Sequence, residues 1–314
     1  MDVKYYIKKI KEKIIRYFFH RMTKSVFDLP SADHFSSDHD EVILLSMLQE
    51  TDVQMYLLAV KSMMQYLQVS KVVIVCDPRL TQASKNIIQQ HVVNVDFLDA
   101  LQYQHEQIPQ GGCWERLYAI SHVNQDAYVI QMDADILVLK PPQEVIDAVK
   151  LNRSFILGTN SKFNQISISE MSATAAQWTE KYEAQGIEPH IQVKAEVCLA
   201  KLAETLGLTN YTRGCAGFAG FAKGSITPKS VRRVSQSFRQ KLGKQWNSWG
   251  TEQFASNLLL SNTADVTVLP TDKYNSSDRY TEDFIFSHFI GSSRFFNTLY
   301  LRLAQQVIIK LKTA

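Results

Sequence analysis

The chain has 314 residues, of which 45% are hydrophobic and 21% are charged, and its formal net charge at pH 7 is +3. This length and composition predict one large α/β domain, alone or with small appendages, and the modest net charge does not indicate a nucleic-acid partner. The four cysteines form no Cys-x-x-Cys pair. A zinc site is therefore not expected, and reduced thiols would suit a cytoplasmic protein.

Residues 1–28 begin with a predicted basic amphipathic helix. Residues 1–24 carry eight lysines and arginines against two acids, and Ile7, Ile10 and Ile14 recur at helical spacing. One interpretation is attachment to an anionic membrane surface, and the other is a helix packed on the domain with its lysines in solvent. The interleaved lysines argue against a signal peptide, and no apolar run approaches the roughly 20 residues that span a bilayer.

Residues 29–40 are polar and lack periodicity, which predicts a linker before a domain at 41–297. In that domain, apolar runs that predict strands alternate with segments of helical periodicity, at 41–48, 52–67, 71–76, 81–90, 92–97, 114–122 and 128–132. This alternation predicts a doubly wound, mostly parallel α/β sheet, which binds ligands at the carboxyl ends of its strands. Neither a dinucleotide fingerprint nor a phosphate-binding P-loop is present.

The sharpest motif is Asp133-Ala134-Asp135, which directly follows the predicted strand at 128–132. Residues two apart in extended backbone point to the same side, so the two carboxylates would share one patch and repel each other. A hard divalent cation such as Mg²⁺ or Mn²⁺ would relieve that repulsion and leave room for substrate phosphates. The alternative is a pair of solvated acids in a turn.

With this motif the sequence resembles the GT-A glycosyltransferases, in particular glycosyltransferase family 8, the group of glycogenin and the bacterial lipopolysaccharide galactosyltransferases. The resemblance implies that Asp133 and Asp135 bind Mn²⁺ and the diphosphate of a nucleotide sugar. Arg116-Leu117 stands seventeen positions before Asp133. It is similar to the family's Arg-Leu pair, whose arginine contacts the donor.

Two later segments extend the resemblance, in the same order as in the family. Glu252-Gln253 at a predicted helix start is similar to the first two positions of an Asp-Gln-Asp segment. His288-x-x-Gly291-x-x-Arg294 is similar to a His-x-x-Gly-x-x-Lys motif. The resemblance implies that His288 is the third metal ligand and that Gly291 and Arg294 approach the donor phosphates. The replacement of that lysine by arginine marks this chain as a divergent relative.

The sequence therefore predicts a GT-A glycosyltransferase that is metal-dependent and uses Mn²⁺ or Mg²⁺ with a nucleotide-sugar donor, in particular a UDP-sugar. The metal set is Asp133, Asp135 and His288, and the catalytic candidates are Glu252 and Gln253. The donor-binding set comprises Asp77, Arg116, Asp133, Ala134, Asp135, Gly291 and Arg294. The resemblance favours retention of anomeric configuration, although Glu252 would also serve as the base of an inverting enzyme. The alternatives are a catalytically inactive sugar- or nucleotide-binding protein and a sugar nucleotidyltransferase.

The acceptor is expected to be a glycan or a lipid-linked glycan. Residues 160–210 follow the metal motif as an insertion that would build the acceptor side, where Trp178, Tyr182 and His190 would stack on a sugar or form a local core. A second basic amphipathic helix is predicted at 298–314, like a segment that the bacterial galactosyltransferases use for membrane attachment. The two ends together would place a cytoplasmic protein at the inner membrane face.

Overall fold

The computed structural model describes residues 3–33, 41–291 and 294–313. Within them the central sheet has seven strands in the order β10-β6-β9-β4-β1-β2-β3. The strands are β1 (Val42–Leu48), β2 (Lys71–Cys76), β3 (Val95–Asp99), β4 (Tyr128–Met132), β6 (Phe155–Gly158), β9 (Gly214–Phe221) and β10 (Thr267–Val268). Only β9 runs antiparallel to its neighbours β4 and β6 among these strands, and the other pairs are parallel.

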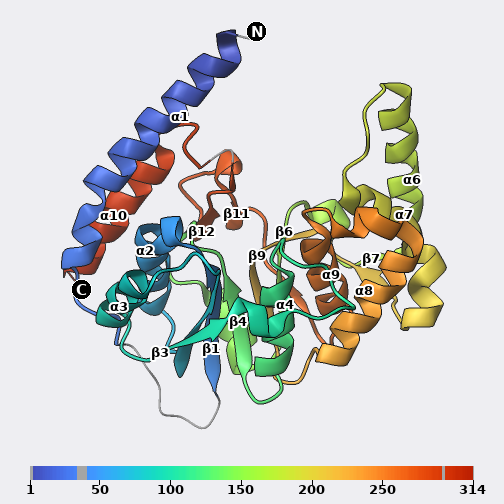
Figure 1. The fold of residues 1–314 in the computed structure, drawn as a ribbon, viewed down its shortest axis with the longest axis horizontal. Coiled ribbons are helices and arrows are strands. Elements are labelled where there is room, and N and C mark those ends of the chain that lie inside the picture. The colour runs from blue at the N-terminus through green and yellow to red at the C-terminus, as the bar shows by residue number, and fades with distance from the viewer. Residues whose placement is uncertain (1–2, 34–40, 292–293, 314) are drawn as a thin grey trace.

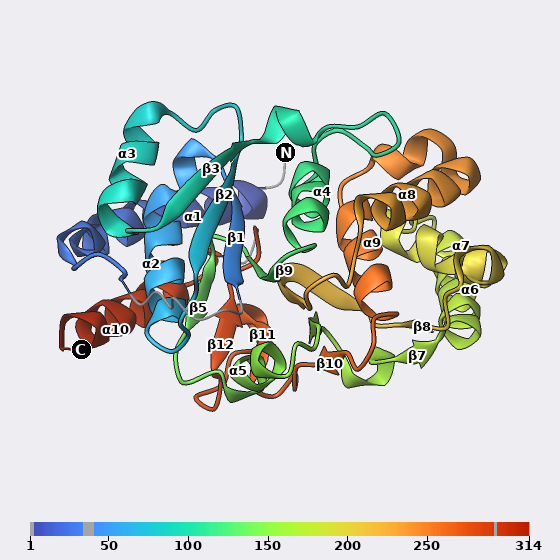
Figure 2. The same cartoon turned by 90° about the horizontal axis from the view of Figure 1, so that it is seen from below.

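Helices cover both faces of the sheet, as Figure 2 shows. On one face lie α2 (Val53–Met64), α3 (Gln82–His91) and α5 (Gln143–Lys150). On the other lie α4 (Trp114–Val123), α8 (Pro228–Leu242) and α9 (Thr251–Leu260). The central strands are buried on both sides because their apolar runs are nearly continuous, as in β4, where every residue is buried, whereas the edge strands β3 and β10 are partly exposed. This doubly wound, mostly parallel sheet with flanking helices is the arrangement that the GT-A prediction requires, and the predicted fold class is confirmed.

A small second sheet continues from the end of β4. Its order is β11-β12-β5, formed by β11 (Tyr274–Ser276), β12 (Phe286–His288) and β5 (Ile136–Val138). β12 runs antiparallel to β5, with His288 opposite Ile136. The pairing brings a segment from near the end of the chain to the turn between β4 and β5.

The segment after β6 forms a protruding helical hairpin (Figure 1). It comprises α6 (Ile168–Ala184) and α7 (Ile191–Leu206), flanked by the paired short strands β7 (Ile166–Ser167) and β8 (Asn210–Tyr211). The helices α6, α7, α8 and α9 pack together next to β9, at the right of Figure 2. Side chains cap the starts of α6, α7 and α8: at the start of α6, for example, Ser167 accepts a hydrogen bond from the Glu170 amide.

The two terminal helices lie side by side at one end of the molecule, as α1 (Val3–Met22) and α10 (Leu299–Thr313) in Figure 1. The apolar stripe of α10 is buried, with Tyr300 stacked between Phe19 at 4.3 Å and Phe289 at 4.0 Å (ring centroids). The apolar stripe of α10 therefore packs within the protein. In this structure it does not face outward, as it would if both terminal helices attached to a membrane by their apolar stripes.

The predicted linker is only partly described, because residues 34–40 lie outside the described residues. Its first part runs along the domain: Leu29 is buried, and Ala32 forms a parallel bridge with Val92. No helix in the described part of the chain is both long enough and apolar enough to cross a membrane.

Candidate metal and donor site

The turn between β4 and β5 holds the two aspartates, and backbone hydrogen bonds fix it on both sides. The Asp133 amide donates to the Gly217 carbonyl of β9 at 2.8 Å, and the Phe289 amide donates to the Asp135 carbonyl at 2.8 Å. These two hydrogen bonds connect the turn after β4 to β9 on one side and to the residue that follows β12 on the other. His288 comes to the two aspartates through this long-range pairing.

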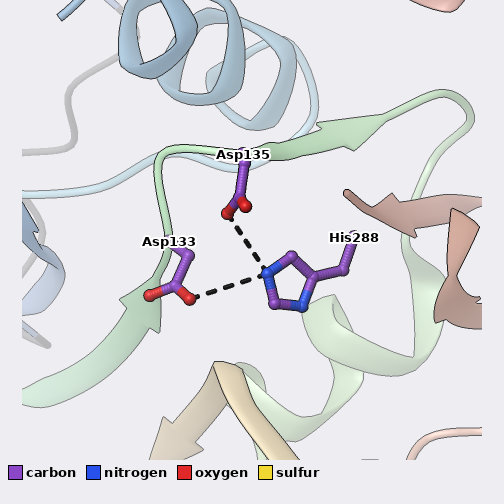
Figure 3. A group of neighbouring side chains, drawn as sticks. All are labelled: Asp133, Asp135 and His288. Atoms are coloured by element: carbon purple, nitrogen blue, oxygen red, sulfur yellow. Dashed lines mark hydrogen bonds and ion pairs between the residues drawn. The ribbon is translucent and has the colours of Figure 1, made fainter. Parts of the chain in front are cut away.

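Three side chains converge on one point, as Figure 3 shows. His288 Nε2 lies 3.2 Å from Asp135 Oδ1 and 3.6 Å from Asp133 Oδ2. One ligand atom from each of these residues lies within 4.8 Å of the others. Asp135 and His288 are buried, whereas Asp133 is partly open to solvent. The structure brings together the three residues that the sequence predicts as metal ligands.

The second oxygen of each aspartate is bound by an arginine. Arg116 Nη1 of α4 pairs with Asp133 Oδ1, and Arg294 Nη2 pairs with Asp135 Oδ2. Each carboxylate therefore uses its outer oxygen for an arginine and turns its inner oxygen toward His288. This division leaves two carboxylate oxygens and one imidazole nitrogen facing a common point, a donor set that suits Mn²⁺ or Mg²⁺.

The position of the His288 ring explains why residue 217 in β9 is a glycine. A Cβ on Gly217 would lie 2.1 Å from His288 Cε1, a distance at which the ring could not stay in place. On the same strand, Cys215 Sγ lies 3.4 Å from His288 Nδ1. The ring thus rests on the bare backbone of Gly217, with Cys215 at one nitrogen and the aspartates at the other. A neighbour at the outer nitrogen fixes the ring orientation of a metal-binding histidine.

The charges of the cluster are strongly coupled. Burial disfavours the Asp135 carboxylate, but His288 and Arg294 outweigh that effect and the pKa of Asp135 falls below its usual value. Burial likewise disfavours the imidazolium of His288, yet Cys215 and Asp135 hold the pKa of His288 well above its usual value. The cluster therefore favours positive charge at the point between the aspartates.

Glu252 and Gln253 stand at the start of α9, next to this cluster. Burial, opposed by Arg116, raises the pKa of Glu252 to about 7. Glu252 Oε1 accepts from Arg116 Nη2 at 3.3 Å, so the same guanidinium bridges Glu252 and Asp133. Gln253 Oε1 accepts from the Ala216 amide at 3.3 Å, and its Nε2 donates to Gln192 Oε1 at 3.3 Å.

The remaining predicted donor residues lie at or near the carboxyl edge of the sheet. Asp77 follows β2, where its carboxylate makes two contacts with the Arg79 guanidinium at 2.8 and 3.1 Å. Ala134 is buried within the turn. Gly291 has a left-handed backbone with φ of +25° and precedes residues 292–293, which lie outside the described part. None of these three is among the side chains that meet at His288 within the described residues.

Sequence reasoning selected Arg116 and Arg294 as donor-binding residues but did not predict their contacts with the two aspartates. In the structure Arg116 is buried between Asp133 and Glu252. Asp52 is outside the predicted site set, yet it lies close enough to Arg294 and Asp135 for both charges to act on its pKa, which burial raises above its usual value. The supporting role of Gly217 had one available signal, the glycine-rich stretch around β9, but no spacing rule connects it with His288.

On the β9 side of the site lies a second group of polar and aromatic residues. Arg213 Nε donates to Glu196 Oε1 at 2.9 Å, and the guanidinium lies over the Trp178 ring at 4.9 Å. The Gln192 amide at the start of α7 donates to His190 Nδ1, and the His190 ring lies 6.3 Å from that of the largely exposed Trp249. Trp178 and His190 therefore have local structural partners, while Tyr182 and Trp249 remain exposed.

No protein-family model matches the sequence, and no curated protein matches it. Solved structures with similar folds include the WbbM bifunctional glycosyltransferase, with 13% identity over 88% of this chain and a TM-score of 0.49. This chain spans about half of that protein, 52% of its length.

The galactosyltransferase LgtC, solved with donor and acceptor sugar analogues, has 11% identity and a TM-score of 0.46 over 87% of this chain and 97% of its own. Core-mannan synthase A from Aspergillus fumigatus, in an Mn/GDP form, has 10% identity and a TM-score of 0.41 over 78% of this chain and 80% of its own. Likeness at this level assigns neither a family nor an activity, so the functional conclusion must come from the site.

Proposed function

We propose that the protein is a metal-dependent glycosyltransferase that moves a sugar from a nucleotide-sugar donor, a UDP-sugar, to a glycan or lipid-linked acceptor. The observation that carries the proposal is the convergence of Asp133, Asp135 and His288 at the carboxyl edge of a parallel sheet. Edges of this kind bind ligands, and the donor set fits a cation that accompanies phosphates.

In this proposal Asp133, Asp135 and His288 hold Mn²⁺ or Mg²⁺. When bound, the cation supplies Lewis-acid stabilisation of the charge that develops on the departing nucleoside diphosphate. Arg294 is one quarter exposed at its side chain and could add charge-assisted hydrogen bonds to a phosphate. Arg116 is buried, so we assign it the orientation of Asp133 and Glu252.

Glu252 and Gln253 are the proposed catalytic residues. Gln253 is held at both ends of its amide, by Ala216 and by Gln192, which presents it in one orientation beside β9. Glu252 has a pKa of about 7 and so exchanges its proton near neutral pH. Its Arg116 contact is more compatible with electrostatic support of the reaction than with a free base, which agrees with the retaining mechanism that the resemblance favours.

Thermal unfolding with a panel of nucleotide sugars tests the proposal. A ligand that binds only the folded state raises the unfolding midpoint. We expect one UDP-sugar to raise it in the presence of Mn²⁺ and to do so far less without the metal. Asp133→Asn and Asp135→Asn should lose this response, whereas Asp147→Asn, on the exposed side of α5, should keep it.

Product analysis separates the alternatives. A transferase releases UDP when an acceptor is added, whereas a nucleotidyltransferase would release pyrophosphate from UTP and a sugar phosphate. A binding protein would show the metal-dependent shift and no turnover. A folded protein that responds to no nucleotide sugar and to no metal would remove the basis of the proposal.

A further inference from the structure

The outward face of α1 is apolar along most of the helix. Ile7, Ile10, Ile14, Tyr17 and Phe18 are each between 47% and 62% exposed. At about 100° per residue these positions share one side of the helix, so they form a continuous stripe. A contiguous exposed apolar surface of this kind usually marks an interaction site.

The stripe is not the surface by which α1 packs on the protein. Over residues 6–22 of the helix, the buried apolar residues are Ile15 and Phe19, and Phe19 contacts the rings of Phe295 at 5.4 Å and Tyr300 at 4.3 Å. These two residues lie on the other side of the helix from Ile10 and Tyr17. The intramolecular packing therefore leaves the stripe uncovered, and its apolar character calls for a contact outside the domain.

Basic side chains border the stripe. Lys13 and Arg21 are exposed on the apolar side, and Lys8 and Lys11 lie over the Phe296 ring at 5.3 and 5.7 Å. The exposed surface thus combines apolar side chains, aromatic rings and positive charge, the composition of helices that lie in a membrane interface.

We propose that the outer face of α1 docks on an anionic phospholipid surface, with the helix lying in the plane of the interface. The isoleucines and aromatic rings would enter the boundary between headgroups and acyl chains, and the flanking cations would face the lipid phosphates. A second copy of the chain is a poorer occupant, because pairing two α1 stripes would bring two basic borders together. The inference does not depend on the proposed transferase activity.

Flotation of the full-length protein with vesicles tests this docking. We expect binding to vesicles that contain phosphatidylglycerol, weaker binding to pure phosphatidylcholine, and release at high salt. The triple variant Ile7→Gln, Ile10→Gln, Ile14→Gln should bind roughly tenfold or more weakly, because it removes the apolar contact. Lys13→Gln with Arg21→Gln should lose about fivefold per charge.

Two controls keep the test specific. Lys150→Gln with Lys229→Gln removes the same charge from exposed sites on α5 and α8 and should leave binding unchanged. The unfolding midpoints should stay close to wild type, because all the substituted side chains are exposed. Equal flotation of the triple glutamine variant and the wild type would overturn the proposal. So would a protein that fails to bind vesicles but forms a dimer that the triple variant abolishes.

Discussion

The two flanks of the candidate site differ in how their charges are satisfied. On the metal side, each aspartate has one arginine partner, and both turn an oxygen toward His288. On the β9 side, Glu196 is fully buried while its partner Arg213 is partly exposed, and aromatic side chains such as Trp249 stand exposed. The first region is organised before any ligand arrives, whereas the second presents open surface. We infer that donor binding is preorganised and that acceptor recognition depends on exposed side chains.

The largest expected effect comes from a substitution that disturbs the metal side without replacing one of the candidate metal ligands. Gly217→Ala would place a Cβ 2.1 Å from His288 Cε1 and displace the ring. We expect Mn²⁺ affinity to fall by about a hundredfold, the upper range for changes in residues that support a ligand. Calorimetric titration of Mn²⁺ measures the change.

Gly186→Ala is the matched control for that substitution. Gly186 lies in a turn with a positive φ of +66°, unlike Gly217 in β9, and nothing lies within 4 Å of its added Cβ. It should cost about 1 kcal/mol of stability through backbone strain and leave Mn²⁺ affinity unchanged. Similar metal affinities for the two variants would show that Gly217 does not hold His288 in position.

The buried charge on the β9 side should appear in the pH dependence of stability. Burial, opposed by Arg213, raises the pKa of Glu196 to about 7, above its unfolded value near 4.5. Because its folded-state pKa is raised, the Glu196 carboxyl contributes stability in its protonated form. This contribution is fully present below about pH 4.5 and is lost as the pH rises through about 7. The free energy of unfolding of Glu196→Gln, measured relative to that of wild type, should therefore rise by on the order of 2 kcal/mol between pH 5 and pH 8.

Urea unfolding at several pH values gives this difference directly. Glu204→Gln, at an exposed position of the same helix α7, is the control and should show no such trend. A stability difference between Glu196→Gln and wild type that does not vary with pH would mean that Glu196 titrates normally.

Cys215 offers a smaller test of the metal side. Its sulfur contacts His288 Nδ1, the nitrogen that faces away from the aspartates. Cys215→Ala removes that partner, and we expect Mn²⁺ affinity to fall about tenfold, while Cys215→Ser should recover part of the loss. Cys198→Ala on α7 is the control. Unchanged Mn²⁺ binding in Cys215→Ala would limit Cys215 to a packing role.

The smallest expected effect concerns the exposed aromatic surface. Trp249 is 69% exposed and lies two residues before the start of α9, close in sequence to Glu252 and Gln253. We expect Trp249→Ala to raise the KM for the acceptor about fivefold, a loss typical of one aromatic contact, and to leave donor binding intact. Tyr182→Ala, on α6, serves as comparison in the same kinetic assay. A loss of donor affinity in Trp249→Ala would contradict the division between the two flanks.

Local pattern accounts for the elements that could be predicted from the sequence. The apolar runs at 41–48, 71–76 and 128–132 correspond to β1, β2 and β4, because strands buried on both faces need continuous apolar sequence. The run at 92–97 predicted its strand too early, since β3 begins at Val95. The packing of the two terminal helices could not be predicted, because periodicity identifies an apolar stripe without showing what covers it. The stripe of α10 is buried, whereas that of α1 is exposed.

The candidate site could be predicted only where the order of motifs along the chain indicated which residues come together in space. Asp133 and Asp135 are two positions apart in the sequence, and His288 was added through a resemblance rather than through spacing. The pairing of β12 with β5, which brings His288 to Asp135, is a long-range contact that no local pattern encodes. The same holds for Arg116, whose charge is enclosed by Asp133 and Glu252, and for Gly217, whose role depends on a ring 71 positions later.

The central claim is that Asp133, Asp135 and His288 form one divalent-cation site that serves a nucleoside diphosphate. Electron paramagnetic resonance of Mn²⁺ tests it directly, because bound ion loses the free-ion signal. We predict that the protein binds one Mn²⁺, that UDP tightens this binding, and that Asp135→Asn abolishes both effects while the variant remains folded. Mn²⁺ binding that is equally strong in Asp135→Asn, or that does not respond to UDP, would contradict the account.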